Sequence, residues 1–414
     1  MSRILLINIK KLLQIRSLDT SYVSGKEMDE LPFIESAYLL INNDIIEEFG
    51  EMKNSPKNLE KFRVIDCKEK MVLPSWCDSH SHIVFSGNRS NEFIDRIKGL
   101  SYNEIANNGG GILNSVDILR NTSKEDLLKQ STIRVKEVIN QGTGAIEIKS
   151  GYGLNMESEK KMLEVISEIK KQNNITVKAT FLGAHAFPRE FTDNKSEYID
   201  LIVNKMMPQY NEARLIDFVD VFCEKGYFDI KQSERVLSKA KELGIRAKIH
   251  VNQFNSFGGI KLALKYEALS VDHLEVLTNE DLTNLKNGST IPVALPTCSY
   301  FLGINYAPAR KIIDSGLPLA IASDYNPGSS PSGNMNFVVS TACIKMKLTS
   351  EEAINAATIN GAYAMGISDK VGSITKGKIA NLIITKDINS INEIPYSFGS
   401  GKISEVILAG KIIN

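Results

Sequence analysis

Short apolar runs alternate with longer stretches whose apolar residues recur at helical spacing, and this alternation fills the middle of the chain. The apolar runs are short enough to be buried strands and lie at residues 73–85, 145–148, 176–182, 218–223, 246–251, 269–272, 290–295 and 317–322. Stretches with helical spacing separate most of them, at residues 124–140, 156–171, 196–210, 231–243 and 257–267. Eight strands that alternate with helices predict a (β/α)₈ barrel, and we assign residues 73–369 to this catalytic unit.

The two ends of the chain have a different pattern, made of short strand-like runs. These runs lie at residues 4–9, 37–41, 45–49 and 62–66 before the barrel, and at 380–385 and 405–412 after it. The turn Asn42-Asn43-Asp44 and the segment 406–411 are typical of β-hairpins. We therefore predict a small β-sandwich domain built from both termini, residues 1–72 and 370–414.

Residues 86–123 form a long stretch between the first two predicted barrel strands. It contains the triplet Gly109-Gly110-Gly111. Because connections of this length inside compact domains usually have a function, we expect a functional loop there.

Composition and charge exclude several kinds of partner. The 414 residues are 43% hydrophobic and carry 49 basic and 49 acidic side chains, so the formal net charge is zero. This balance gives no reason to expect a nucleic acid or an anionic membrane as partner. The sequence has no apolar stretch long enough to span a bilayer, and its first residues lack the order of a signal peptide. The five cysteines are scattered without a Cys-x-x-Cys pair, which favours the reducing cytoplasm.

Histidine is rare in this chain and occurs only at the carboxyl ends of predicted strands. The five residues are His80, His82, His185, His250 and His273. Side chains two residues apart on a strand project to the same side, so His80 and His82 present their imidazoles together. The carboxyl ends of the strands form the active-site face of a (β/α)₈ barrel. We therefore predict that all five histidines serve one site.

A metal ion is the simplest explanation for this cluster. His80, His82 and His250 offer neutral nitrogen ligands, and Asp324, after the eighth strand, offers an oxygen. We predict one divalent or trivalent metal ion per subunit, zinc or iron, which would lower the pKa of a bound water to about 7. His273 lies one strand further on, where it can transfer a proton or stabilise an oxyanion.

The residues at these strand ends resemble those of the amidohydrolase superfamily. The resemblance is carried by Pro74, by the string Asp78-Ser79-His80-Ser81-His82, by His250, His273 and Asp324, and by the segments 357–362 and 371–382. Asn381 departs from the Asp usual in the last segment, and we expect no catalytic effect from this difference.

A closer resemblance, over nearly the whole chain, is to the imidazolonepropionase family. It is carried by the strings at residues 84–93, 109–112, 147–154, 182–185 and 323–329. It implies a small-molecule substrate, 4-imidazolone-5-propanoate, which water opens to N-formimidoyl-L-glutamate in the third step of histidine degradation. The implied chemistry is attack of metal-activated hydroxide on the cyclic amide carbonyl. The resemblance also implies a homodimer.

The resemblance and the shape of this substrate suggest roles for individual side chains. The forked cation of Arg89 suits the propionate carboxylate, and Tyr102 is a weaker candidate for the same end. Tyr152 and His185 can hydrogen-bond or stack on the flat ring. A further group directly follows Asp324 and can donate to substrate or product, namely Asn326, Gly328 and Ser329. We expect Gln253 to orient the substrate, and His273 and Asp324 to carry protons.

Three alternatives use the same barrel. A deaminase of the superfamily typically has Glu at the place of Gln253, and an amide side chain is neither acid nor base near neutral pH. A binuclear hydrolase often bridges its metals with a lysine on the fourth strand, but Lys149 ends the second and Glu224 ends the fourth. We expect Lys149 and Glu224 to be ion-pair members or outer partners of the ligands. A scaffold protein without metal should lack some ligands, whereas all four are present here.

Overall fold

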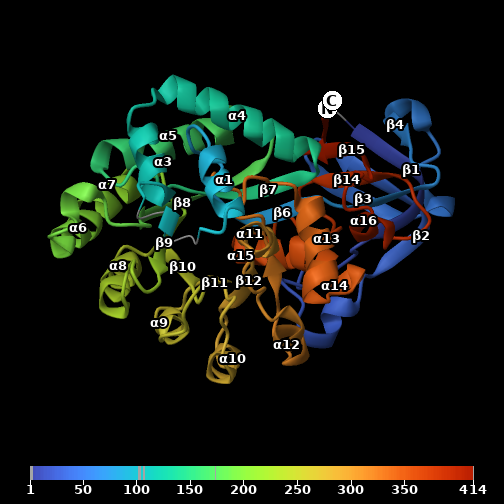
Figure 1. Cartoon of the computed structure of the whole chain (residues 1–414). Coiled ribbons are helices and arrows are strands. Elements are labelled where there is room, and N and C mark those ends of the chain that lie inside the picture. The colour runs from blue at the N-terminus through green and yellow to red at the C-terminus, as the bar shows by residue number, and fades with distance from the viewer. Residues whose placement is uncertain (1–2, 101–103, 106–107, 173, 414) are drawn as a thin grey trace.

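Eight parallel strands form the barrel that the alternating pattern predicts (Figure 1). The computed structural model describes residues 3–100, 104–105, 108–172 and 174–413. The barrel strands, in spatial order, are β6 (Trp76–Ser81), β7 (Thr143–Lys149), β8 (Thr176–Ala184), β9 (Phe218–Cys223), β10 (Arg246–Val251), β11 (Ser270–His273), β12 (Ile291–Ala294) and β13 (Ala320–Ile321). A parallel bridge between Ser81 and Tyr325, just beyond β13, joins the last strand segment to the first. The prediction of a (β/α)₈ barrel is therefore confirmed.

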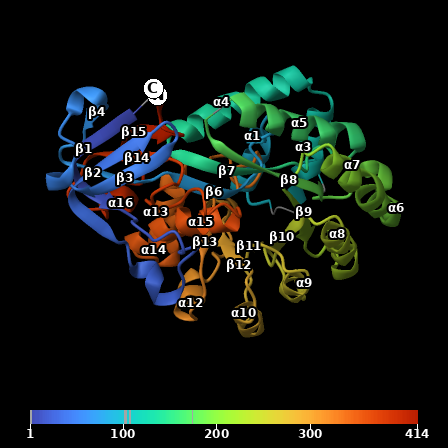
Figure 2. The same ribbon diagram turned by 180° about the vertical axis from the view of Figure 1, so that it is seen from behind.

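Helices surround the barrel on its outer side (Figure 2). They are α4 (Lys124–Asn140), α5 (Met156–Gln172), α6 (Lys195–Leu201), α7 (Met207–Glu212), α8 (Ile230–Glu242), α9 (Gly259–Lys265), α10 (Asn279–Lys286), α11 (Pro296–Leu302), α12 (Ala309–Asp314), α13 (Met335–Met346), α14 (Ser350–Ala357) and α15 (Ile359–Ala364). A π-helical turn, Ile202–Met206, joins α6 to α7. Several helices begin at a side-chain cap, and Asp229, Thr278 and Thr349 each form a reciprocal capping box.

The prediction that residues 86–123 form a loop is wrong in part, because two helices lie within the segment. They are α1 (Ser90–Ile97) and α3 (Gly111–Arg120). The inner face of α3 carries Ile112, Val116 and Leu119, which are buried at helical spacing. This spacing was present in the sequence, but the adjacent glycines masked it.

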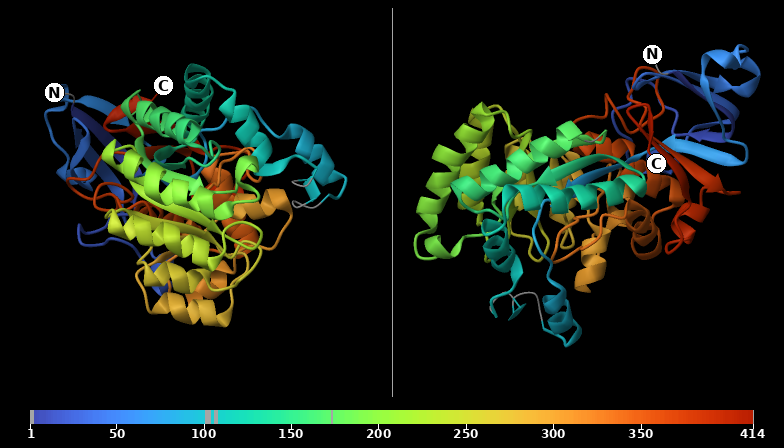
Figure 3. Two further views of the ribbon diagram at one scale, coloured as in Figure 1. Left: turned by 90° about the vertical axis from the view of Figure 1, so that its left-hand side faces the viewer. Right: turned by 90° about the horizontal axis from the view of Figure 1, so that it is seen from above.

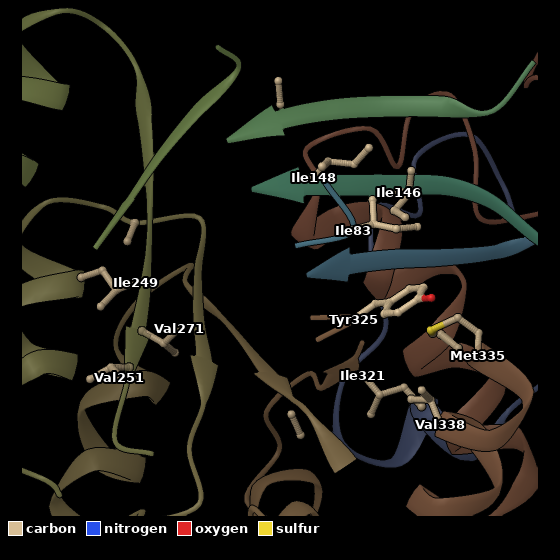
Figure 4. Close-up of a cluster of buried hydrophobic side chains, with 14 of the residues drawn as sticks. Ile83, Ile146, Ile148, Ile249, Val251, Val271, Ile321, Tyr325, Met335 and Val338 are labelled. Carbon is tan, nitrogen blue, oxygen red and sulfur yellow. The ribbon is translucent and has the colours of Figure 1, made fainter. Parts of the chain in front are cut away.

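Alternation along the barrel strands separates a polar interior from an apolar exterior. On β7, Glu147 and Lys149 join an internal ion-pair network, whereas Ile146 and Ile148 belong to the hydrophobic core outside it. On β10 and β11, Ile249, Val251 and Val271 likewise belong to the hydrophobic core outside the barrel. Figure 4 shows these outward side chains, together with Ile321 and Tyr325 packed beside Met335 and Val338 of α13. The barrel interior therefore holds charged side chains, and the hydrophobic core lies outside the strands.

Strands from both termini share one second sheet beside the barrel (Figure 3). Its order is β16 (Lys411–Ile413), β15 (Ile403–Leu408), β14 (Leu382–Asp387), β5 (Lys70–Pro74), β1 (Arg3–Leu13), β2 (Phe33–Asn42) and β3 (Ile45–Glu51), with β4 (Arg63–Asp66) paired to β1. The two predicted hairpins are confirmed, since β2 pairs with β3 and β15 pairs with β16, both antiparallel. The domain limits at residues 72 and 370 stay a prediction. Smaller elements are α16 (Glu393–Tyr396) and 3₁₀ turns at Gly25–Asp29, Met52–Asn54, Leu59–Lys61 and Arg189–Phe191.

The first predicted barrel strand, residues 73–85, is wrong in its extent because the chain changes sheets at Ser75. The Ser75 amide donates to Asn381 of the terminal sheet, and the next amide, that of Trp76, donates to Gly142 beside the barrel. A continuous apolar run therefore supplies β5 to one sheet and β6 to the other.

Among the helices of the described residues, none combines the length and the apolar composition that crossing a membrane requires.

Candidate active site

One pocket at the carboxyl ends of the barrel strands brings most of the predicted side chains together. It is lined by His82, Arg89, Ile112, Tyr152, His185, Phe222, His250, Gln253, His273, Asp324, Asn326 and Ser329. His80 is fully buried and does not line the pocket, but its ring lies 4.4 Å from that of His250 between ring centres. Tyr102 lies outside the described residues, so its predicted role stays a prediction.

Four donor atoms converge at this site with the spacing of metal ligands. Nε2 of His80 and Nε2 of His82 each lie 3.6 Å from Oδ1 of Asp324. Nε2 of His250 lies 3.4 Å from Nε2 of His82. Ligands at the usual zinc–nitrogen distance in a tetrahedral site are about 3.3 Å apart, so the spacing fits one ion. Nε2 of His80 is buried without a hydrogen-bond partner in the structure, as expected of an atom reserved for a ligand.

Carboxylates behind two of these histidines fix their orientation. Oδ2 of Asp272 lies 2.6 Å from Nδ1 of His80, and Oδ2 of Asp220 lies 2.9 Å from Nδ1 of His250. The Asp272 carboxylate accepts a hydrogen bond from Nδ1 of His80, so Nε2 of His80 turns a lone pair toward the site. The approach of Asp220 to Nδ1 of His250 is an ionic contact outside hydrogen-bond geometry. Both carboxylates were missed in the sequence, although each lies on the inward face of its strand and Asp272 directly precedes His273.

A buried ion-pair network lies beneath the ligands. Lys149 contacts Glu147 at 2.5 Å and Asp220 at 2.7 Å, and its predicted place in an ion pair is therefore observed. Lys248 contacts the other oxygen of Glu147 and also donates to the Ser79 carbonyl at 2.8 Å. Burial, reinforced by Lys149, lowers the pKa of His80 well below its ordinary value. Burial also lowers the pKa of His82, so His80 and His82 stay neutral, which is the form that binds a metal.

Glu224 forms no ion pair with any residue that the structure describes, contrary to one of the two roles expected for it. Its carboxylate accepts from the amides of Phe254 and Asn255 at 2.9 and 3.3 Å. It thereby anchors the loop that follows β10 and carries Gln253. The side-chain nitrogen Nε2 of Gln253 lies 3.6 Å from Sγ of Cys298.

Both predicted proton carriers, His273 and Asp324, have backbones in the left-handed region. The φ angles are +91° at His273 and +52° at Asp324. Non-glycine residues held in this way cost about 1–3 kcal/mol each, and such strain clusters at functional sites. The strain turns both side chains into the pocket at the ends of their strands.

Glu275 lies beside His273 and was also missed in the sequence. Its Oε1 is 3.5 Å from Nδ1 of His273 and accepts from Ser299 at 3.1 Å. Burial opposes a charge on His273, but the attraction of Glu275 outweighs it and raises the pKa of the imidazole. His273 is therefore suited to hold a proton close to Asp324.

Arg89 adds a buried cation to the wall of the pocket. Its Nε donates to Oγ of Ser115 at 2.9 Å and its Nη1 lies 4.0 Å from Glu92, while Nη2 is buried without a partner in the structure. Arg89 lines the pocket, and a guanidinium group suits an anionic ligand. Gly328 does not line the pocket but packs on this side chain, because a Cβ there would lie 2.0 Å from Nη1.

The turn after Asp324 is held by its own side chains. Oδ1 of Asn326 accepts from the amides of Gly328 and Ser329, both at 2.8 Å. Oγ of Ser329 lies 3.3 Å from Oδ2 of Asp324. Asn326 and Ser329 thus reach the pocket from a rigid turn.

Aromatic rings line the pocket beside the metal ligand His82. His185 stacks on His82 with ring centres 5.2 Å apart, and Tyr152 meets His185 edge-on at 5.4 Å. Burial lowers the pKa of His185 to about 3. Ile112 and Phe222 also line the pocket and were not predicted, because isolated apolar residues carry no sequence signal of a site.

Comparison with known proteins identifies the family of the chain. Residues 71–413 match the model of the Amidohydrolase family. An imidazolonepropionase of Flavobacterium psychrophilum is 59% identical over 409 residues, covering 99% of both chains, and one of Alkaliphilus metalliredigens is 39% identical over 392 residues, covering 94% of this chain and 93% of that one. Among solved structures, E. coli guanine deaminase has a TM-score of 0.76 at 15% identity, covering 100% of this chain and 99% of that one, which shows the fold alone.

Proposed function

We propose how this site works from the premise that the chain belongs to the amidohydrolase family and, within it, to the imidazolonepropionases. The chain hydrolyses 4-imidazolone-5-propanoate to N-formimidoyl-L-glutamate, the third step of histidine degradation. Water breaks the ring bond between carbonyl carbon and nitrogen: its oxygen joins the carbon, and a proton joins the departing nitrogen. The observation that carries the proposal is the cluster of three imidazoles with the Asp324 carboxylate at a pocket whose wall also contains Arg89.

The members of this family depend on a metal, and the donor set here fits one ion. His80, His82, His250 and Asp324 would hold one zinc or iron ion per subunit, in the divalent or trivalent state. Such an ion supplies Lewis-acid chemistry, because it lowers the pKa of a water molecule and polarises the amide carbonyl. The carboxylates of Asp220 and Asp272 keep the histidine lone pairs turned toward it.

Proton transfer falls to Asp324 and His273. Asp324 has a second oxygen, Oδ2, which faces Ser329 and can accept the proton that water loses. His273 in its protonated form donates to the oxygen of the tetrahedral intermediate, and Glu275 keeps that form favourable. The departing ring nitrogen then takes a proton from one of these two groups. No base at position 253 is required, so Gln253 orients the substrate.

Recognition of the substrate uses the other end of the pocket. Arg89 binds the propionate carboxylate through its unpartnered Nη2. Tyr152 and His185 contact the ring, and Asn326 and Ser329 face it from the turn behind it. The substrate contact expected of Gly328 is not supported, because Gly328 packs on Arg89 outside the pocket lining. The length of the propionate arm thus sets the distance between the ring and Arg89.

A coupled assay tests the function. Urocanase generates the unstable imidazolone propionate in the cuvette, and its ultraviolet absorbance is followed with and without this chain, before and after chelation. We expect fast, chelator-sensitive loss of absorbance and the appearance of N-formimidoyl-L-glutamate. No acceleration by metal-replete protein would overturn the proposal.

We further propose that the enzyme is a homodimer in the cytoplasm. All five cysteines are free thiols, which supports a reducing compartment. The dimer rests on the family resemblance, and sedimentation equilibrium of the purified protein tests it: a single species at the monomer mass would refute it.

A further inference from the structure

Glu159 is a fully buried carboxylate near the pocket that the mechanism above does not use. It lies in the first turn of α5 and has no exposed surface. Its Oε1 accepts from the amides of Gly153 and Leu154 at 2.7 and 2.9 Å, and both of its oxygens lie 3.2 Å from the amide of Gly151. A carboxylate that collects backbone amides from one loop fixes the path of that loop.

The loop held in this way is the one that carries Tyr152. Two of its residues have left-handed backbones, with φ of +107° at Gly151 and +50° at Leu154. At Gly153 a Cβ would lie 2.4 Å from the amide nitrogen of Glu159, so the loop closes tightly over the helix end. The hydrogen bonds that Glu159 accepts from these amides compensate for the energy cost of the left-handed backbone.

The same loop sets the tautomer of His185. The carbonyl oxygen of Gly151 lies 2.9 Å from Nδ1 of His185, and a carbonyl can only accept. Nδ1 therefore carries the hydrogen, and Nε2 has a bare lone pair on a ring that lines the pocket. In this tautomer His185 accepts a hydrogen bond from an N–H group and cannot donate one to a carbonyl.

We infer that Glu159 is a positioning residue for ring recognition: through the loop 150–154 it fixes Tyr152 and the Nδ1–H tautomer of His185, so that the site selects a ring with an N–H group at that place. The inference rests on the proposed function for its substrate. Its structural part, the link between Glu159 and His185, does not depend on that function.

The substitution Glu159→Gln tests the link, because it keeps the size of the side chain and replaces one acceptor oxygen by a donor that faces backbone amides. The matched control is Glu157→Gln, which removes the same charge from the same helical turn at an exposed position. Metal content and thermal unfolding are measured for both variants. If Glu159→Gln fails to fold, Glu159→Asp replaces it, since it keeps the charge and withdraws the carboxylate from the loop.

Two measurements are made on the zinc-loaded protein. The first is the ¹⁵N spectrum of its imidazoles, which is tractable with only five histidines. We expect the wild type and Glu157→Gln to show His185 protonated at Nδ1 alone, and Glu159→Gln to show a mixture of tautomers. The second is steady-state kinetics. We expect kcat/KM of Glu159→Gln to fall about 10- to 100-fold, mainly through KM, as is typical when an outer partner of a functional histidine is removed.

The outcomes separate the two proposals. If the wild type does not open the imidazolone ring, the proposed function fails, while the spectrum still tests the link to His185. If the wild type is active but Glu159→Gln changes neither the tautomer of His185 nor KM, Glu159 only stabilises the fold and the inference is overturned. An equal loss of activity in Glu157→Gln would also overturn it, because helix charge alone would then explain the effect.

Discussion

Replacement of Arg89 by methionine should weaken substrate binding with little effect on the chemical step. Met fills the space of the buried arginine stem and removes only the forked cation. Alanine would also leave a cavity, because the Arg89 side chain is only 4% exposed. Glu92 would lose the cation that lies 4.0 Å away, but it keeps its bonds from the Gly111 amide at 3.2 Å and the Asn114 amide group at 3.1 Å. We therefore expect Arg89→Met to fold.

The magnitude follows from the hydrogen bonds that the carboxylate loses. A hydrogen bond to a charged group contributes about 1.5–3 kcal/mol, and each 1.4 kcal/mol corresponds to about tenfold in affinity, so KM should rise roughly 10- to 150-fold. The propionate is remote from the reacting carbonyl and is bound equally in the ground and transition states. Such uniform binding affects KM and leaves kcat nearly unchanged.

The assay is the coupled ring-opening reaction over a range of substrate concentrations, with metal content measured in parallel. Arg96→Met is the control, because Arg96 lies in α1, which begins directly after Arg89, with its cation 5.3 Å from the ring centre of Phe301, and it does not line the pocket. An unchanged KM in Arg89→Met would refute the assignment. A loss of metal would mean that Arg89 supports the ligands instead.

Three further predictions concern the metal end of the pocket. His273→Ala should lower kcat by at least about a hundredfold with metal content unchanged, as measured by turnover and metal analysis, whereas loss of the metal would assign His273 to the ligand shell. Asp220→Asn should weaken metal binding about 10- to 100-fold in a competition titration with a chelator, because His250 loses the carboxylate that lies 2.9 Å from its Nδ1. Burial lowers the pKa of His185 to about 3, below its value of about 6.5 in the unfolded chain. The contribution of this residue to folding stability is therefore complete above about pH 6.5 and is lost as the pH falls toward 3. In metal-free protein this histidine should contribute about 1.4 kcal/mol per pH unit to the slope of unfolding free energy between these values, and His185→Gln should flatten the slope in denaturant titrations.

The barrel could be predicted from the sequence because each of its strands is a local signal. A run such as 218–223 is apolar except at Asp220 and is followed by a helical pattern, so neither feature needs knowledge of distant residues. The change of sheet at Ser75 could not be predicted in the same way. It depends on which amides pair with Asn381 and Gly142, and those partners are distant in the sequence.

The candidate site could likewise be predicted from the sequence only in part. Histidines at strand ends are conspicuous because they are rare, and the structure gathers all five of them around one pocket. The residues that orient them are acidic side chains, which are common throughout the chain. Only the barrel registers bring Asp272 beside His80 and Asp220 beside His250. Glu159 is similar, since its partners follow from the path of a loop and not from a motif.

The buried charges of the barrel interior supply an independent argument for a cation. The network under the ligands contains the carboxylates of Glu147, Asp220 and Asp272 and the ammonium groups of Lys149 and Lys248, and Asp324 adds a fourth carboxylate above it. Four negative groups against two positive ones leave two negative charges in a region that excludes water. The ligand histidine His80 cannot compensate, because burial and Lys149 keep its pKa low. Without an ion, burial and the neighbouring carboxylates raise the pKa of Asp272. A divalent cation at the converging nitrogen atoms would balance this surplus, so the residues that orient the ligands also set the charge that the site requires.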